Sequence, residues 1–330
     1  MKKYLFFIIL FVLGLFFVFS QTQALTISPA KIILSADPGE KIVTRMTVMS
    51  DSEQTLVFYP TFEGYTTRGG EEPVFTPEKL DLPTWIKTDP SELTLGPGEK
   101  KEVQVIIEIP EDAPPGGHYA VIFWQSMPLN KEKAGVGITT RVGALVLLEV
   151  SGNVVESAEI LNFETPEKFN NRLPINFSYD LKNTGNVHIM PVGKVVIRNF
   201  LGRAITSFPA NPQGGYALPG TTRTYQTASW QPKNEMPDIE GTGFFSELQR
   251  ELSAFALGYY RAKLSLEYGQ KEIKTVQASY GFWVLPWRVL IPAILILVII
   301  LLVFTKGLKK YNQWIINKAK EGLNEKEKTK

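Results

Sequence analysis

The chain contains two histidines, and one of them, His118, lies in a stretch that could support chemistry. This stretch, EIPEDAPPGGHYAVIFWQS, runs from Glu108 to Ser126 and places His118 between a double glycine and an aromatic-rich run. Histidine serves as a general base or a metal ligand near neutral pH. However, neither His118 nor His188 stands at a metal-ligand spacing such as HExxH, and the sequence identifies no partner for either. We predict that both are structural or surface residues and that His118 is the first residue of a strand.

Acidic pairs are the second group of residues that could do chemistry. A glycosidase needs two carboxyl groups that flank the scissile bond, and nothing in the sequence places a pair across a cleft. The sequence also lacks GxSxG, P-loop and GxGxxG motifs, and it contains no cysteine. We therefore predict a protein that is not an enzyme and has no catalytic residue, metal or cofactor; a cell-wall glycosidase is an alternative. The acidic pairs are Glu71 with Glu72, Asp89 with Glu92, and Glu111 with Asp112.

A binding surface is the third possibility, in the stretch TLVFYPTFEGY. If its phenylalanines face the core, the residues between them face outward, and these include Tyr59, Glu63 and, two positions on, Tyr65. Aromatic faces beside polar groups can stack on sugar rings or anchor a protein partner. We predict Tyr59, Glu63 and Tyr65 as ligand-binding residues. The alternative is an ordinary strand whose tyrosines are half covered by a neighbour.

The elements that would position these residues are strands, because the apolar pattern of the body has a period of two. In EKKEVQVIIEIP, alternate residues from Val103 to Ile109 are apolar. Three Pro-Gly turns, at residues 38–39, 97–98 and 219–220, each precede an alternating segment. The predicted fold is all-β with two immunoglobulin-like sandwiches, at residues 25–150 and 151–280, since each segment is near the size of such a domain.

The second domain carries one helical insertion, GFFSELQRELSAFALG. Its apolar residues recur at helical spacing and form a stripe. We expect this stripe to pack on its own sandwich; lying on a membrane surface is the alternative. The stripe consists of Phe244, Phe245, Leu248, Leu252 and Phe255.

Two apolar segments frame the body. Residues 1–24 combine lysines, an apolar run and a small-residue end at Ala24, which predicts a secretory signal peptide; an uncleaved anchor is the alternative. Residues 282–305 form a longer apolar run that predicts one transmembrane helix. Trp283 and Trp287 at one edge fit an aromatic belt at the membrane interface.

The tail at residues 306–330 holds eight lysines and three glutamates, although the whole chain has a formal net charge of only +2. Lys306, Lys309 and Lys310 follow the apolar run directly, so the positive-inside rule predicts a cytoplasmic tail and a body outside the cell or in the periplasm. The segment YNQWIINKAK continues either as an amphipathic helix or as a solvated tail. The body between the two segments is acidic, which argues against nucleic acid as a partner.

The layout resembles that of the WxL-interacting proteins. The resemblance rests on LTISPAKIILSADPGEKIVTRMTVMS, IPEDAPPGGHYAVIFWQS and RVGALVLLEVSG, followed by a second β-domain, one membrane helix and a lysine-rich tail. It implies a surface protein whose first domain binds peptidoglycan and whose second domain contacts host or partner proteins. The second domain departs from the family in KNTGNVHIMPVGKVVIRNFLGRAI and in the helical insertion, and no binding motif matches position by position.

The sequence as a whole predicts a membrane-anchored, non-enzymatic cell-surface protein. Its β-sandwich domains would bind cell-wall polymer, meaning peptidoglycan, or a partner surface protein. An alternative is a chaperone-like immunoglobulin-fold factor, which would lend an edge strand to exported proteins during their assembly.

Overall fold

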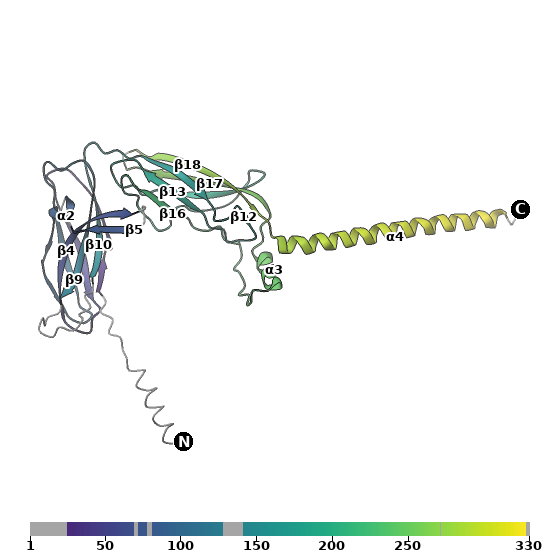
Figure 1. The fold of residues 1–330 in the computed structure, drawn as a ribbon, viewed down its shortest axis with the longest axis horizontal. Helices are drawn as coiled ribbons and strands as arrows, with labels where there is room; N and C mark the ends of the chain where they lie inside the picture. Colours follow the sequence, from purple (N-terminus) through teal and green to yellow (C-terminus); the bar gives the residue numbers. More distant parts are fainter. Residues whose placement is uncertain (1–24, 69–71, 78–80, 128–140, 271, 328–330) are drawn as a thin grey trace, which may run out of the picture.

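The computed structural model describes residues 25–68, 72–77, 81–127, 141–270 and 272–327. The predicted signal peptide, residues 1–24, lies outside the described residues, as does Glu71. The described chain forms two β-sandwiches followed by one long helix, α4 (Figure 1). The predicted fold class, all-β with two immunoglobulin-like sandwiches and a C-terminal apolar helix, is confirmed.

The first sandwich is built from strands β1 to β10. One sheet has the order β1-β3-β8-β6, and the other has the order β2-β10-β9-β4-β5, with β7 paired to β4. The short helix α2 (Leu82–Trp85) precedes β6. The strands are β1 (Leu25–Ser28), β2 (Lys31–Ala36), β3 (Lys41–Ser50), β4 (Leu56–Arg68), β5 (Glu72–Thr76), β6 (Ile86–Asp89), β7 (Leu93–Leu95), β8 (Lys100–Glu108), β9 (Gly116–Met127) and β10 (Arg141–Val150).

The alternation of the sequence builds the first core. Val103, Val105 and Ile107 of β8 are fully buried, as the period of two predicts. On the facing sheet, Trp124 of β9 is also fully buried, and its indole N–H points at the Met46 sulfur, 3.5 Å away. These inward residues leave the odd-numbered residues of β4 and β9 on the outer face of the second sheet.

The second sandwich is built from strands β11 to β18 and carries helix α3 (Phe244–Ser253). Its sheets have the orders β11-β13-β16 and β12-β18-β17-β14-β15. The strands are β11 (Ala158–Glu164), β12 (Phe169–Asn170), β13 (Ser178–Asn183), β14 (Val192–Asn199), β15 (Ala204–Pro209), β16 (Thr222–Gln226), β17 (Gly258–Tyr268) and β18 (Lys274–Val284).

The apolar stripe of α3 does not pack into the sandwich, contrary to the expectation from the sequence. Phe245 is 80% exposed, and Phe244, Leu252 and Phe255 are exposed as well. The buried residue of this helix is instead Glu251, whose carboxylate accepts hydrogen bonds from Arg288 at the start of α4. Helical periodicity identified the stripe but not the side that faces the protein.

Helix α4 runs from Trp287 to Glu327 and therefore begins later than the predicted start at residue 282. Phe282 and Val284 are fully buried in the second core on β18, whereas Trp283 on the same strand is 39% exposed. The apolar run continues from a core strand into the helix, so hydropathy alone could not locate the boundary. Within α4, the segment Trp287–Asn317 is long and apolar enough to span a membrane, with a mean hydropathy of 2.9 and none of its most apolar window buried.

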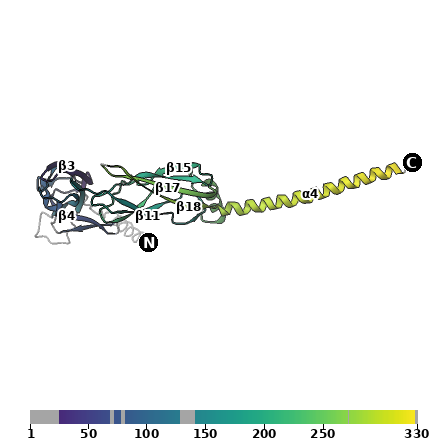
Figure 2. The same ribbon diagram turned by 90° about the horizontal axis from the view of Figure 1, so that it is seen from above.

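The two views agree on the arrangement of these parts. Helix α4 leaves the end of the second domain that lies away from the first domain, and it projects clear of both sandwiches (Figures 1 and 2). Strand β5 of the first domain extends toward the second domain (Figure 1).

Phe282 provides a test of the boundary between β18 and α4. Because its ring packs against Phe177, Trp230 and Tyr260 in the second core, Phe282→Ala should lower the free energy of unfolding by about 3–5 kcal/mol. The control is Trp283→Ala, on the other face of the strand, which should cost about 1 kcal/mol. Urea unfolding of the chain in lipid nanodiscs measures both. A larger loss for Trp283→Ala than for Phe282→Ala would contradict the assignment of Phe282 to the core.

Candidate functional site

Two of the three predicted binding residues, Glu63 and Tyr65, lie in one cluster on the outer face of the first domain. The Tyr65 ring lies 6.0 Å from the Phe75 ring of β5, and Phe75 meets Phe123 of β9 edge-on at 5.0 Å. Glu63 forms an ion pair with Arg141 of β10. We call Glu63, Tyr65, Phe75, Phe123 and Arg141 the outer-face cluster. It crosses four neighbouring strands of one sheet.

Arg141 and Gly143 explain how Phe123 is held. The Arg141 guanidinium lies 3.5 Å from the centre of the Phe123 ring, a cation–π contact. A Cβ at Gly143 would come within 2.6 Å of the same ring, so only glycine lets the ring lie over β10. Phe123 is therefore covered, whereas Phe75 is 37% exposed and offers an accessible aromatic face.

Tyr59 lies further along the same face of β4, opposite Gln125 of β9. It is half-buried, as Glu63 and Tyr65 are. This is the half-covered state that the alternative interpretation described. Of the three predicted residues, the structure places Glu63 and Tyr65 in the cluster that contains the exposed Phe75. Tyr59 is on the same face of β4 but lies four residues before Glu63 and six before Tyr65.

Two cations lie where the outer-face cluster approaches the second domain. Burial lowers the pKa of Lys31, and the positive charge of Arg223 lowers it further. Burial raises the pKa of Tyr65, while the same Arg223 acts in the opposite direction. Arg223 of β16 is thus close enough to act on residues of β2 and β4 in the first domain.

Carbonyl oxygens and aromatic rings hold these two cations. The Lys31 ammonium lies 3.5 Å from the Gly214 carbonyl oxygen and 4.8 Å from the centre of the Tyr216 ring. The Arg223 guanidinium donates to the Tyr216 carbonyl at 2.8 Å and lies over the Tyr225 ring. Carbonyl oxygens and aromatic rings carry no net charge, so they do not neutralise the positive charges of Lys31 and Arg223. The surface around these two side chains therefore favours an anionic group.

The loop that contains His188 fixes the second domain against the first. The Gly117 N–H donates to the Asn186 carbonyl at 2.8 Å, and a Cβ at Gly116, where φ is 125°, would come within 2.7 Å of the same oxygen. The double glycine therefore lets the second domain approach the start of β9. The sequence analysis predicted His118 as the first residue of its strand. Strand β9 begins at Gly116, so His118 is instead its third residue.

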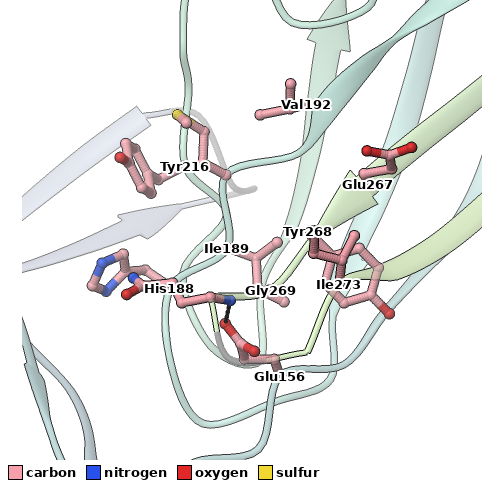
Figure 3. Close-up of a pocket in the computed structure, with 11 residues that line it drawn as sticks. Glu156, His188, Ile189, Val192, Tyr216, Glu267, Tyr268, Gly269 and Ile273 are labelled. Atoms are coloured by element: carbon pink, nitrogen blue, oxygen red, sulfur yellow. Dashed lines mark hydrogen bonds between the residues drawn. The ribbon is translucent and has the colours of Figure 1, made fainter.

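His188 borders a cavity of about 280 Å³ at this junction (Figure 3). Burial lowers the pKa of His188 to about 4, so its ring is neutral at neutral pH. Glu156 and Glu267 line the same cavity, but the Glu156 carboxylate is engaged by the backbone N–H of Gln270 at 2.9 Å, the dashed contact in Figure 3. The cavity is slightly smaller than typical small-molecule sites.

His118 is held by a carboxylate that the sequence analysis did not identify. Its Nδ1 lies 2.7 and 2.8 Å from the two carboxylate oxygens of Asp81, and its Nε2 lies 2.8 Å from the Pro114 carbonyl. Burial acts to lower the pKa of His118, but the Asp81 and Pro114 contacts outweigh it and raise the pKa. Because both ring nitrogens face acceptors, neither is available to a substrate, and the His118–Asp81 pair is structural.

The remaining predicted residues lie on the surface. Asp89, Glu92, Glu111 and Asp112 are exposed, as is Glu72. Lys306, Lys309 and Lys310 are exposed on α4, beyond its apolar section. Trp287 is the first residue of α4 and is 41% exposed, whereas Trp283 is on β18 and packs against Tyr259. Within the described residues, no three acidic or histidine side chains are grouped to hold a metal ion.

No protein-family model and no curated protein sequence matches the chain. Several solved structures resemble it weakly. The class 5 fimbriae chaperone CfaA is 11% identical with a TM-score of 0.38, and the match covers 80% of this chain and all of that one. The E. coli chaperone DraB is 9% identical with a TM-score of 0.37, covering 78% of this chain and 98% of its own. The Pseudomonas aeruginosa CupB2 chaperone is 9% identical with a TM-score of 0.35, covering 78% and 100%. Values this low do not identify a function.

The His118–Asp81 pair predicts a pH dependence of stability. The pKa of His118 in the folded protein lies above the unfolded value near 6.5. The stabilisation from the charged pair is therefore fully present below pH 6.5 and is lost as the pH rises through the folded pKa. Asp81→Asn should therefore destabilise the protein more at pH 6 than at pH 9. Urea unfolding at both pH values measures this, with Asp112→Asn, an exposed aspartate, as the control. An equal loss at both pH values would contradict the charged pair.

Proposed function

We propose that the chain is a non-enzymatic binding protein, anchored in a membrane by α4, that binds cell-wall polymer through the outer-face cluster and the neighbouring cations. The single observation that carries the proposal is the exposed Phe75 ring beside Tyr65, the tyrosine whose pKa burial raises and the positive charge of Arg223 lowers. Peptidoglycan offers both complementary groups, since its sugar rings have flat apolar faces and its peptides carry carboxylates. A partner surface protein is the other ligand that the same surface would suit.

The orientation of the chain is part of the proposal. The body lies outside the cell or in the periplasm, and the lysine-rich tail lies in the cytoplasm. Lys306, Lys309 and Lys310 support this, because they follow the apolar section of α4 directly while Arg288 is the cation at its start. The resemblance to WxL-interacting proteins, which comes from the sequence, agrees with this layout and with peptidoglycan as the ligand of the first domain.

A second candidate function, lending or accepting a strand as an assembly chaperone does, has one observation in its favour. Strand β2 pairs with Leu145–Val150 of β10 only. The preceding segment of β10, Arg141–Ala144, pairs with β9 on one side, and no described strand lies on its other side. An open edge of this kind can pair with a strand of a partner protein.

Binding to peptidoglycan tests the first proposal. In a sedimentation assay with purified insoluble peptidoglycan and the full chain in lipid nanodiscs, Phe75→Ala should weaken binding by about tenfold, the effect of losing about 1.4 kcal/mol of aromatic contact. Arg223→Gln should weaken it and make it less sensitive to salt. The control is Leu161→Ala, an exposed apolar residue of β11 outside the cluster. Absence of wild-type binding, or equal losses for Phe75→Ala and Leu161→Ala, would rule out this site.

Hydrogen exchange tests the second candidate. The full chain is mixed with the exported proteins of its own cell, and backbone amide exchange is compared with that of the chain alone. Pairing with a partner strand should slow exchange in Arg141–Ala144, with little change in Leu145–Val150, which already has two neighbours. Unchanged exchange in Arg141–Ala144 would contradict strand pairing at this edge.

A further inference from the structure

The end of the second domain from which α4 leaves carries exposed apolar residues from three separate segments. The first is the turn between β14 and β15. Asn199, the last residue of β14, pairs with Tyr260 near the start of β17, and the start of β17 pairs with Val284, the last residue of β18. The turn therefore lies at the end of the sheet where α4 begins. Phe200 and Leu201 in this turn are 72% and 75% exposed.

The second segment is β12, which lies along the last residues of β18. Phe169 pairs with Trp283, so it lies at the same end of the sheet. This residue is 57% exposed. Phe169 is not part of the second core. Because it pairs with Trp283, it lies near the start of α4.

The third segment is α3, which lies beside the first turn of α4 (Figure 1). Glu251 of α3 is fully buried and accepts a hydrogen bond from the Arg288 backbone N–H at 2.9 Å and one from its guanidinium at 2.8 Å. Glu247, one turn earlier, pairs with Arg172. Glu247 and Glu251 of α3 thus face the protein, whereas Phe245 and Leu252, about a quarter of a turn or more around the helix from Glu251, are exposed, as is Phe244 at the start of the helix.

This orientation is the reverse of that of an amphipathic helix on a protein in water, which buries its apolar side and exposes its charges. It is the orientation of a helix whose apolar side faces lipid. Arg288, the second residue of α4, fixes the orientation of α3 because it binds Glu251. The exposed apolar residues of α3 therefore lie beside the start of the apolar helix α4.

We propose that Phe169, Phe200, Leu201, Phe244, Phe245 and Leu252, here called the basal patch, insert into the interfacial layer of the membrane that α4 crosses. The proposal rests on the membrane anchoring in the proposed function. Lipid is the occupant that fits, because the patch surrounds the origin of a lipid-spanning helix on three segments. Exposed cations at the same end, Lys168 and Arg203, suit anionic headgroups.

Insertion of the basal patch would fix the second domain against the membrane surface. A single helix alone leaves a domain free to tilt about the point where the helix leaves it. Contacts on three segments around that point remove this freedom. The second domain would then hold the first domain, with its outer-face cluster, at a defined distance from the membrane.

Site-directed labelling tests the proposal on the full chain, which contains no native cysteine. Single cysteines are introduced as Phe245→Cys and Leu201→Cys and labelled with an environment-sensitive fluorophore. The protein is then placed in nanodiscs of zwitterionic and anionic phospholipid with nitroxide lipids as quenchers. Val192→Cys, on an exposed residue at the opposite end of β14, is the control, and Ile299→Cys in α4 reports membrane insertion itself.

The expected result is that labels at residues 245 and 201 lose most of their fluorescence to a nitroxide near the headgroups and less to one deep in the chains, since interfacial helices sit at a shallow depth. The label at residue 299 should be quenched by the deep nitroxide, and the label at residue 192 by neither. Quenching at residue 299 without quenching at residues 245 and 201 would overturn the basal patch and leave the anchoring intact. No quenching at residue 299 would overturn both.

Discussion

The structure depends on one constraint: none of the residues that the structure describes covers the apolar surface of α4. The segment Trp287–Asn317 has a mean hydropathy of 2.9, and its most apolar window is entirely unburied. Exposing such a surface to water would cost about 25 cal/mol for each Å² of apolar area, and the proposed membrane anchoring would place it in lipid. The buried Glu251–Arg288 contact then joins the second domain to this helix, and the domain junction around Gly117 and Asn186 joins the first domain to the second.

Glu251 and His118, two buried ionisable side chains of the body, make contacts that have structural roles. A carboxylate removed from water is costly unless it is paired and hydrogen-bonded, and Glu251 satisfies this with both the backbone and the guanidinium of Arg288. The buried His118 ring has both of its nitrogens hydrogen-bonded, to the Asp81 carboxylate and to the Pro114 carbonyl. Each contact fixes the direction of a segment, α3 in one case and the start of β9 in the other. Lys31 and Arg223, in contrast, contact carbonyl oxygens and aromatic rings, and the charge of Arg223 acts on Tyr65 of the outer-face cluster.

The sequence predicted what depends on local pattern. Alternation identified the buried residues of β8, and helical spacing identified α3. It could not predict pairings between residues far apart in the chain, such as His118 with Asp81, 37 positions apart, or Arg141 with Glu63, 78 apart. It also misplaced the start of α4, because Phe282 and Val284 are as apolar as the helix that follows them. In each case, the missing information was which residues the folded sheets bring together.

Protease accessibility in intact cells tests the central claim, that α4 anchors the body on the outer side of a membrane. An epitope tag is placed after Lys330, and protease is added to whole cells, with any outer membrane opened first. The account predicts that the two sandwiches, residues 25–284, are digested while the tag survives until the cells are lysed. Loss of the tag from intact cells, with the sandwiches protected, would reverse the orientation and contradict the account.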